Sequence, residues 1–363
     1  MARNRGVDLC RIVLMIFITM HHIIAFNYGL YTNPELIPYV ERTVLILINS
    51  FLICAVNVFF LISGYFGIRT NEKKMLGIII DAFCYHLVIT LIGLILGRVS
   101  ITGNMIRHIF VQSENYWFLL VYCMLCVISP YLNKIIESKS LKLTNLVLFE
   151  FLIGCHNLLF NNGNLGWVLG YSLCQAICMY LIGSQLKEIS TESLMNRHPF
   201  LMYVIGSFTV AAMAVFLVSL KPDAKAIERV FSYSNPLIVF NSICFFLFFA
   251  KISLNTSIGE GIGKLSRHAL AVYLILNGNW ILKYLKERMP QVSFWGSLTL
   301  YLLLAIILSM LAMVIDSILK RILKKQLAVF ANWIDMLVRR LLGKCRMIIQ
   351  LIIGGGVMLL MLS

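Results

Sequence analysis

Charged residues are scarce in this chain, and no stretch of it has the composition of a soluble domain. Asp, Glu, Lys and Arg make up 13% of the 363 residues and only 16 residues are acidic, whereas 60% are hydrophobic. Apolar runs long enough for a membrane-spanning helix recur from one end of the sequence to the other. The composition therefore excludes a soluble globular protein and predicts an all-α, polytopic transmembrane helix bundle.

The first apolar run lacks the small-residue cleavage site of a signal peptide, and it begins too late and runs too long for one. We therefore expect it to be a retained helix. About ten spans are predicted in all, separated by short polar connections that carry Gly or Pro. They lie near residues 8–30, 44–68, 76–96, 115–132, 143–160, 167–186, 201–219, 233–250, 268–285 and 295–319.

The cysteines and histidines lack the spacing of a metal centre. Cys123 and Cys126 have the CxxC spacing, but both lie within an apolar run, and no second CxxC or histidine pair completes a zinc site. Buried thiols away from cations are inert and behave as small hydrophobes. We therefore expect no metal and no redox role for the cysteines.

The basic residues are distributed unevenly among the predicted connections. If the N-terminus is cytoplasmic, the connections on that side hold more than two thirds of the 31 Lys and Arg residues, and still the larger share without the C-terminal tail. By the positive-inside rule, this asymmetry predicts a cytoplasmic N-terminus. The net charge of +15 then reflects topology and attraction to anionic lipid, so no nucleic-acid partner is needed.

The chain divides into a membrane domain, residues 1–320, and a basic C-terminal segment, residues 321–363. From Arg321 to Arg346, Arg and Lys recur among apolar residues, which is typical of an amphipathic helix on the inner membrane surface. The final stretch from Met347 to Ser363 is apolar but interrupted by three consecutive glycines. It is either a re-entrant segment or an eleventh span.

An arginine and a histidine pair stand inside the first apolar run. Placing an ionisable side chain in the hydrocarbon core of a membrane raises the free energy by a few kcal/mol or more. Such residues therefore usually face a bundle interior or a polar cavity, and they indicate a functional site. At about 100° per residue, His22 falls within about 20° of Arg11 and about 16 Å along the helix axis, whereas His21 falls about 80° away. The helix geometry therefore favours His22 over His21 as the histidine that shares a functional site with Arg11. Asp8 lies three residues before Arg11 and can pair with its guanidinium group.

A small polar break ends the second predicted span, where the sequence reads Asn57-Val-Phe-Phe-Leu-Ile-Ser-Gly-Tyr-Phe66. Together with the Arg-x10-His pattern of Arg11 and His22, this segment resembles acyltransferase family three, bacterial integral-membrane acyltransferases that often O-acetylate cell-surface polysaccharides. The resemblance covers about residues 5–320. Further matches, in chain order, are Tyr116-Trp117-Phe118, Tyr122, Ser129-Pro130-Tyr131-Leu132-Asn133, Met179-Tyr180-Leu181-Ile182-Gly183, Leu265-Ser266 and Val272-Tyr273-Leu274-Ile275.

The sequence departs from the family pattern at two positions. Family members frequently carry a histidine after the Tyr-Leu-Ile of the ninth span, where this chain has Leu276 followed by Asn277. The glutamate that some relatives have after the tryptophan of the fourth span is also absent. The second departure indicates the subgroup that acts on sugars without an appended periplasmic hydrolase-like domain.

The resemblance implies a multi-pass protein of the bacterial cytoplasmic membrane that uses acetyl-CoA as co-substrate and a carbohydrate as acceptor. Acyl transfer to a hydroxyl needs a base or a nucleophile, and the neutral imidazole of His22 can serve as either. We expect Arg11, held by Asp8, to meet phosphate or carbonyl groups of coenzyme A. The structural alternative is an Asp8–Arg11 pair without catalytic role and a histidine bonded to a neighbouring helix.

Candidate donors for the negatively charged intermediate are Asn57, Ser63 and Tyr65. Alternatively, Ser63 and Tyr65 simply mark a helix end at the membrane interface.

Further side chains complete the predicted site. Arg69, Lys73 and Lys74 are candidates for additional phosphate contacts or are topology signals, and Tyr116 and Trp117 either contact the acceptor or belong to the aromatic belt.

Asp81, His86 and Glu150 also lie within predicted spans and are candidates for lining a cavity. Asp81 and His86 point about 140° apart on one helix, so they are not a simple dyad.

Two other classes of protein remain open. A polysaccharide or small-molecule transporter would show inverted repeats with broken helices, which the sequence does not display. An O-antigen-type polymerase would carry a large external loop, and no external connection here much exceeds about 15 residues.

Overall fold

The computed structural model describes residues 3–69, 72–100, 116–140, 142–160, 168–189, 193–220, 223–276, 280–290 and 292–323, with three single residues beyond. Every regular element in these ranges is a helix, so the predicted all-α class is confirmed. Each predicted span overlaps one or more of these helices, and the span predicted near 268–285 also includes residues 277–279, which lie outside the described ranges. Among the described residues, the stretches both long and apolar enough to cross a membrane are Arg5–Asn27, Tyr39–Phe66, Met75–Ile95, Trp117–Glu137, Pro199–Leu220 and Phe294–Ile322.

The predicted count of about ten spans goes beyond these stretches and stays a prediction. Leu143–Leu159 and Pro236–Ala250 are apolar but shorter. The basic C-terminal segment lies almost wholly outside the described residues, except that the last long helix continues through residue 322. The proposed surface helix and the possible eleventh span are therefore untested.

The longer helices of the bundle, in chain order, are α1 (Arg5–His22), α2 (Tyr39–Leu52), α3 (Ala55–Phe66), α4 (Glu72–Ile95), α6 (Trp117–Glu137), α7 (Leu143–Phe160), α8 (Leu173–Gln185), α10 (Pro199–Leu220), α12 (Pro236–Ala250), α13 (Thr256–Leu265) and α16 (Phe294–Ile322). The shorter helical segments are η1 (Ile23–Asn27), η2 (Pro34–Leu36), η4 (Val168–Gly170), η5 (Leu186–Glu188), α9 (Leu194–Arg197), α11 (Ala224–Val230), η6 (Ser266–His268), α14 (Ala269–Leu276) and α15 (Trp280–Arg288).

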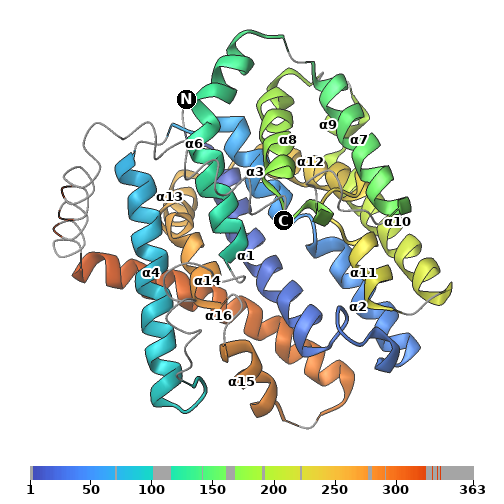
Figure 1. Cartoon of the computed structure of the whole chain (residues 1–363), viewed down its shortest axis with the longest axis vertical. Coiled ribbons are helices and arrows are strands. Elements are labelled where there is room, and N and C mark those ends of the chain that lie inside the picture. The colour runs from blue at the N-terminus through green and yellow to red at the C-terminus, as the bar shows by residue number, and fades with distance from the viewer. Residues whose placement is uncertain are drawn as a thin grey trace.

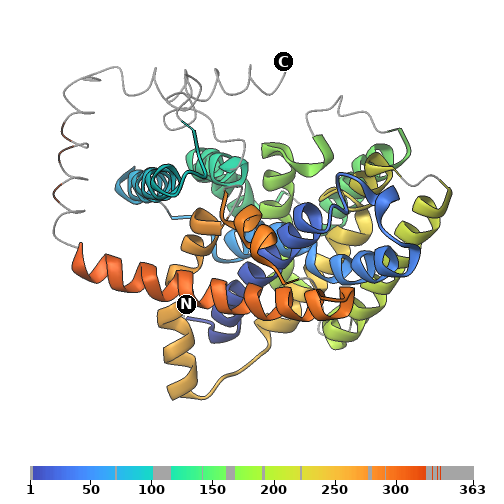
Figure 2. The ribbon, with the colours of Figure 1, turned by 90° about the horizontal axis from the view of Figure 1, so that it is seen from below.

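Helix α1 lies in the interior of the bundle. It contacts α2, α3, α12, α13, α14 and α16, and both views show it enclosed by the other helices (Figure 1 and Figure 2). Helices α4 and α10 lie at opposite edges in Figure 1. A central helix with polar residues can present them to a site enclosed by its neighbours, whereas a peripheral helix would present many of them to lipid.

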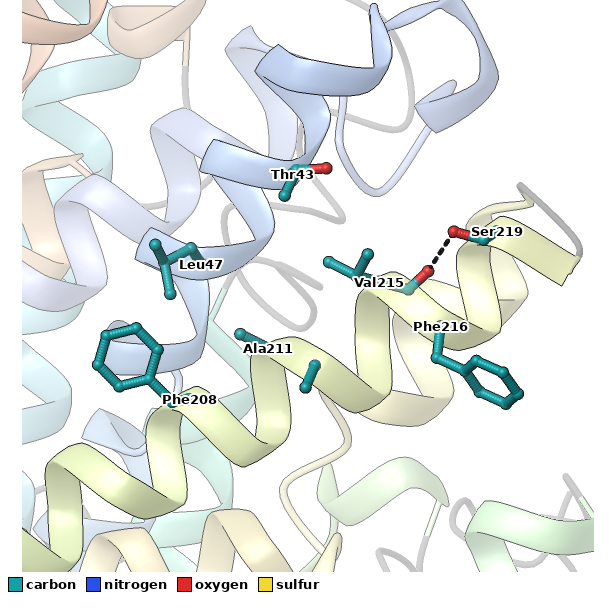
Figure 3. A pocket seen from close by; sticks show the side chains of 8 residues that line it. Thr43, Leu47, Phe208, Ala211, Val215, Phe216 and Ser219 are labelled. Atoms are coloured by element: carbon teal, nitrogen blue, oxygen red, sulfur yellow. Dashed lines mark hydrogen bonds between the residues drawn. The ribbon is translucent and has the colours of Figure 1, made fainter.

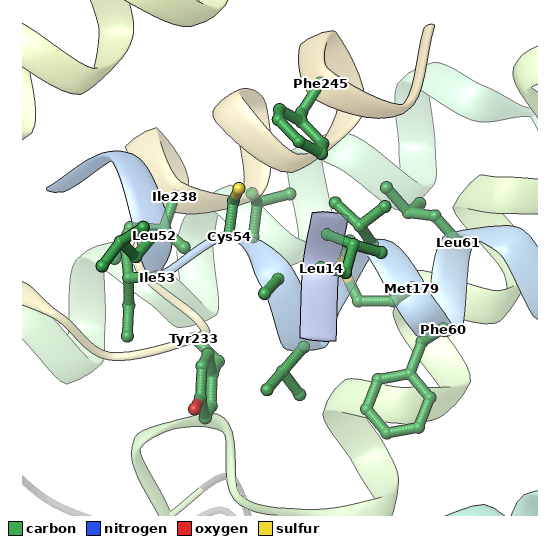
Figure 4. Close-up of a cluster of buried hydrophobic side chains, with 14 of the residues drawn as sticks. Leu14, Leu52, Ile53, Cys54, Phe60, Leu61, Met179, Tyr233, Ile238 and Phe245 are labelled. Atoms are coloured by element: carbon green, nitrogen blue, oxygen red, sulfur yellow. The ribbon is translucent and has the colours of Figure 1, made fainter. Parts of the chain in front are cut away.

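Large apolar side chains fill the space between α1 and its neighbours. Figure 4 shows Leu14 of α1 among residues from α3, α8 and α12, including Phe60, Met179 and Phe245. These side chains have little or no exposed surface. Since a bilayer supplies no hydrophobic force between helices, close packing of this kind, together with polar contacts, holds a membrane bundle together.

The backbones of helices α3 and α8 come into close contact at two glycines that belong to the family-like motifs. A Cβ atom on Gly64 would overlap the carbonyl oxygen of Tyr180, and one on Gly183 would overlap the carbonyl oxygen of Leu61. Small residues at such a crossing let two backbones come into direct contact. The glycines of the Ser-Gly-Tyr and Tyr-Leu-Ile-Gly segments therefore have a packing role.

An open groove runs between α2 and α10 on the outside of the bundle (Figure 3). It encloses about 600 Å³, and Phe208 and Phe216 beside it are more than half exposed. Thr43 and Ser219 are its polar residues, and both hydroxyls bond to carbonyls of their own helices. An apolar surface with its hydroxyls internally satisfied suits contact with lipid chains.

We expect Gly64→Ala to destabilise the protein by about 1–3 kcal/mol, because the added methyl group forces α3 and α8 apart. Gly77→Ala in α4 is the matched control. Nothing lies within 4 Å of a Cβ at Gly77, so this change should be neutral or stabilising by up to about 1 kcal/mol. Thermal unfolding in detergent measures the stability of the two variants. Equal changes in stability for Gly64→Ala and Gly77→Ala would contradict the proposed close contact between α3 and α8.

Candidate active site

A cavity of about 380 Å³ lies beside the N-terminal half of α1. It is bounded by α1, the end of α3, α4, α6, η6 and α14. Most of its wall is apolar, but several polar groups converge on it. The lining residues are Arg11, Met15, Phe59, Ile62, Ser63, Phe66, Gly67, Ile68, Arg69, Ile78, Phe118, Leu119, Tyr122, Ser266, Arg267, Ala269 and Leu270.

The cavity is strongly basic. Arg11, Arg69 and Arg267 line it from separate parts of the chain, and none of the described side chains that line it is acidic. Guanidinium groups offer planar, fixed donors that match phosphate and carboxylate oxygens, and they stay charged at any physiological pH. The hydroxyls of Ser63 and Tyr122 add neutral hydrogen-bonding groups. The cavity can therefore hold an anionic ligand that also carries an apolar part.

Asp8 fixes the position of Arg11. The carboxylate has no exposed surface, and its Oδ1 atom lies 3.1 Å from Nη1 of Arg11. Its Oδ2 atom lies 2.6 Å from Nε of Arg3 and 3.6 Å from Nη1 of Arg5. The predicted Asp8–Arg11 pair is thus present, as part of a larger cluster. A buried carboxylate needs such partners, because an unpaired charge in this environment is strongly unfavourable.

A separate set of hydrogen bonds fixes the backbone beside Arg69. Gly67 ends α3 with φ +73°, a conformation that glycine adopts without strain. The hydroxyl of Tyr180 then accepts a bond from the amide of Ile68 at 2.9 Å and donates to Asn133 at 2.6 Å. Asn133 in turn donates to the carbonyl of Ile68 at 3.1 Å. Two further motif residues therefore hold the segment that brings Arg69 to the cavity.

The two histidines of α1 differ in their surroundings. Nδ1 of the buried His21 lies 2.7 Å from Oδ1 of Asn49, and Nδ2 of Asn49 donates to the hydroxyl of Tyr31 at 3.0 Å. His22 is only partly buried and makes ring contacts with His21 and Phe26. Within the described residues, no hydrogen bond involves the His22 ring. His21 is thus held in place by its neighbours, whereas His22 keeps both ring nitrogens available for a substrate.

The helix changes its winding directly after His22. Residues Ile23–Asn27 form a π-helical turn, η1, in which the amide of Tyr28 bonds to the carbonyl of Ile23. Such turns are rare and occur frequently at functional sites. The end of this turn is tied to the bundle, because Asn27 donates to the carbonyl of Leu282 and Tyr28 bonds to Ser297.

His22 does not line the cavity. The α1 wall of the cavity ends at Met15, seven residues before His22 and about 10 Å from it along the axis. Arg11, Met15 and His22 nevertheless share one face of α1 at about 100° per residue. The structure therefore places the basic cavity and the histidine at two levels of the same helix face.

A cluster of aromatic rings surrounds Trp117 at the N-terminus of α6. Its ring centroid lies 4.7 Å from that of Tyr171 and 5.9 Å from that of Tyr233, with which it is stacked. Asn57 and Gln175 both donate to the carbonyl of Tyr233, at 2.7 and 3.1 Å. Tyr171 keeps 41% of its surface exposed, so this aromatic cluster presents a ring to the outside.

The structure divides the predicted site residues among several locations. Arg11, Ser63 and Arg69 meet at the cavity, whereas Asn57 and Trp117 belong to the aromatic cluster. Tyr65 lies outside the cavity lining and packs against Phe66, Phe246 and the ammonium group of Lys187. Tyr116 donates to the carbonyl of Leu274. The side chains of Lys73 and Lys74 lie outside the described residues.

The other intramembrane ionisable groups do not line the cavity. Asp81 pairs with Lys320 at 2.8 Å, and His86 packs edge-on against Tyr116, so they do not form a dyad. Glu150 is buried in α7. Sequence reasoning did not nominate Tyr122, Ser266 or Arg267, although Tyr122 and Ser266 stand in family-like motifs that gave a usable signal.

Residues 4–315 match a family model described as an acyltransferase domain, that of acyltransferase family three. The chain belongs to this family. No curated protein and no solved structure matches the chain significantly. Together with the apolar helices, the family establishes a multi-pass membrane acyltransferase. The resemblance inferred from the motifs is confirmed over nearly all of the membrane domain.

We expect Asp8→Asn to lower the free energy of unfolding by about 1–3 kcal/mol, because it removes the charge that the cluster of arginines surrounds. The arginines are about one third exposed, which limits the loss. Arg5→Gln, which removes the longer contact at 3.6 Å and shortens a side chain that packs against Gly259 and Gly263, should cost less than Asp8→Asn. Denaturation in detergent compares the two, and an Asp8→Asn protein as stable as the wild type would refute the structural role.

Proposed function

We propose that this acyltransferase moves an acetyl group from acetyl-CoA to a hydroxyl of a cell-surface polysaccharide or a lipid-linked sugar. The observation that carries the proposal is the arrangement along α1. A basic cavity around Arg11 occupies one level, and His22 stands on the same helix face about 16 Å further along. A donor with anionic groups at one end and a thioester at the other fits this arrangement.

The cavity supplies what a coenzyme A donor requires. Its phosphate groups would meet Arg11, Arg69 and Arg267, which can bind several anionic oxygens at once. The apolar lining from Met15, Phe118 and neighbouring residues suits the uncharged arm that carries the thioester. Arg69 is exposed and marks the entrance at the end of α3, whereas Met15 lies deeper along α1.

This donor site implies a direction across the membrane. Acetyl-CoA is made in the cytoplasm, so the end of the bundle that carries Arg69 and Arg267 should face it. The distribution of Lys and Arg supports the same orientation, with a cytoplasmic N-terminus. His22 then lies toward the outer side of the bacterial cytoplasmic membrane.

At His22, an unprotonated ring nitrogen can act in either of two ways. As a base, it takes the proton of the acceptor hydroxyl while that oxygen attacks the thioester carbonyl carbon; the C–S bond then breaks and the proton passes to the departing thiolate. As a nucleophile, it first accepts the acetyl group and releases coenzyme A, and the acceptor hydroxyl then attacks the acetylimidazole. Both routes yield one ester and one free thiol.

The aromatic cluster is the proposed acceptor end. Sugar rings have apolar C–H faces that pack against aromatic side chains, and Tyr171 presents an exposed ring beside Trp117. Asn57 holds this cluster through the carbonyl of Tyr233, so its expected role as a donor to the reacting oxygen becomes a role in organising the acceptor end.

The transporter alternative gains no support from the family match.

We expect His22→Ala to reduce acetyl transfer by at least about 100-fold in purified protein, because general acid–base catalysis contributes about 10²–10⁴. His21→Ala is the matched control. It removes the bond to Asn49 but leaves His22 in place, so it should lower thermal stability and retain more activity. The measurement is coenzyme A release with a matching acceptor, and the reverse order of the two activities would refute the assignment to His22.

A further inference from the structure

A second buried carboxylate bonds to η6, one of the elements that line the cavity. Asp316 of α16 is 1% exposed and accepts bonds from two sides. Its Oδ1 atom lies 2.7 Å from the hydroxyl of Tyr85 in α4, and its Oδ2 atom lies 2.6 Å from Nδ1 of His268 in η6. Because a carboxylate only accepts, Nδ1 of His268 carries the proton in this contact.

Lys320 joins this cluster to α4. Its ammonium nitrogen lies 3.2 Å from Oδ2 of Asp316 and 2.8 Å from Oδ2 of Asp81. The cluster therefore binds α4, η6 and α16 together through contacts between residues far apart in the sequence. Buried polar groups within a membrane bundle are retained where all of them are paired, and these form a connected network.

Both neighbours of Arg267 in η6 are connected to a buried carboxylate, Ser266 through Arg3 and His268 directly. Ser266 accepts a bond from Arg3 at 3.2 Å, and Arg3 is itself paired with Asp8. On the other side of Arg267, His268 is held by Asp316. In a 3₁₀ turn, successive side chains point about 120° apart, so fixing residues 266 and 268 fixes the direction of the residue between them.

We propose that Asp316 is a positioning residue for donor binding, which it supports by holding η6 through His268 so that Arg267 faces the cavity. This inference rests on the proposed function of the cavity as the coenzyme A site. Asp316 does not line the cavity, and Arg267 does. The carboxylate therefore acts through Arg267 and not by touching the donor.

The test is a double-mutant cycle that measures binding of free coenzyme A to the purified full-length protein by calorimetry. Arg267→Met should raise the Kd about tenfold, the loss of one charge-assisted hydrogen bond. Asp316→Asn should raise it about three- to fivefold when Arg267 is present. In the Arg267→Met protein, Asp316→Asn should change the Kd by less than about 1.5-fold, because the residue it positions is gone.

Tyr85→Phe is the matched control, since it removes a hydrogen bond to the same carboxylate but leaves His268 in place. Its Kd should stay within about twofold of wild type. If Asp316→Asn does not fold, His268→Leu replaces it in the cycle. His268→Asn, which keeps an N–H donor near the position of Nδ1, should then restore most of the affinity that His268→Leu loses.

The outcomes separate this inference from the proposed function. An unchanged Kd in Arg267→Met would overturn the coenzyme A site itself. A weakened Arg267→Met protein combined with an unchanged Kd in Asp316→Asn would overturn only the positioning role. Fully additive effects of the two substitutions would also overturn it, because Asp316 would then act independently of Arg267.

Discussion

The site depends on the pairing of buried carboxylates with basic side chains inside an apolar bundle. Asp8 has no exposed surface and anchors Arg3, Arg5 and Arg11, whereas Asp316 anchors groups from α4, η6 and α16. Carboxylates cannot be ionised in such surroundings without partners, and arginines there need anions to hold them. Both clusters bond to elements that line the cavity, Asp8 to Arg11 of α1 and Asp316 to His268 of η6, so the pairing that stabilises the bundle also places positive charge where a ligand can reach it.

Helix α1 connects the basic cavity to the candidate catalytic histidine. Its N-terminal part carries Asp8 and Arg11, and its other end carries His22 at the start of a π-helical turn. The close crossing of α3 and α8 at Gly64 and Gly183 supports the wall that ends at Arg69. The separation of arginine from histidine along one helix face gives the donor phosphates and the reacting thioester different places in the protein.

Features that depend on local periodicity could be predicted from the sequence. The helical class, the shared face of Arg11 and His22, and the Asp8–Arg11 contact follow from a repeat of 3.6 residues. Arg267 reaches the cavity only through tertiary packing, and the contact between Tyr85 and Asp316 joins residues 231 positions apart, so neither has a local signal in the sequence. Tyr65 was predicted to join the site because it follows Ser63 by two residues, but residues two apart on a helix point about 160° apart, and its ring packs toward α12.

The most direct test of the account is the sidedness of the donor in proteoliposomes of known orientation. The N-terminus marks the cavity end of the bundle, because Arg3 contacts Ser266 beside the cavity, so accessibility of an N-terminal tag reports which end faces outward. With acceptor on both sides, the account predicts coenzyme A release only when acetyl-CoA is supplied on the side of the N-terminus. Release only with acetyl-CoA on the opposite side would contradict the assignment of the Arg11, Arg69 and Arg267 cavity as the donor site.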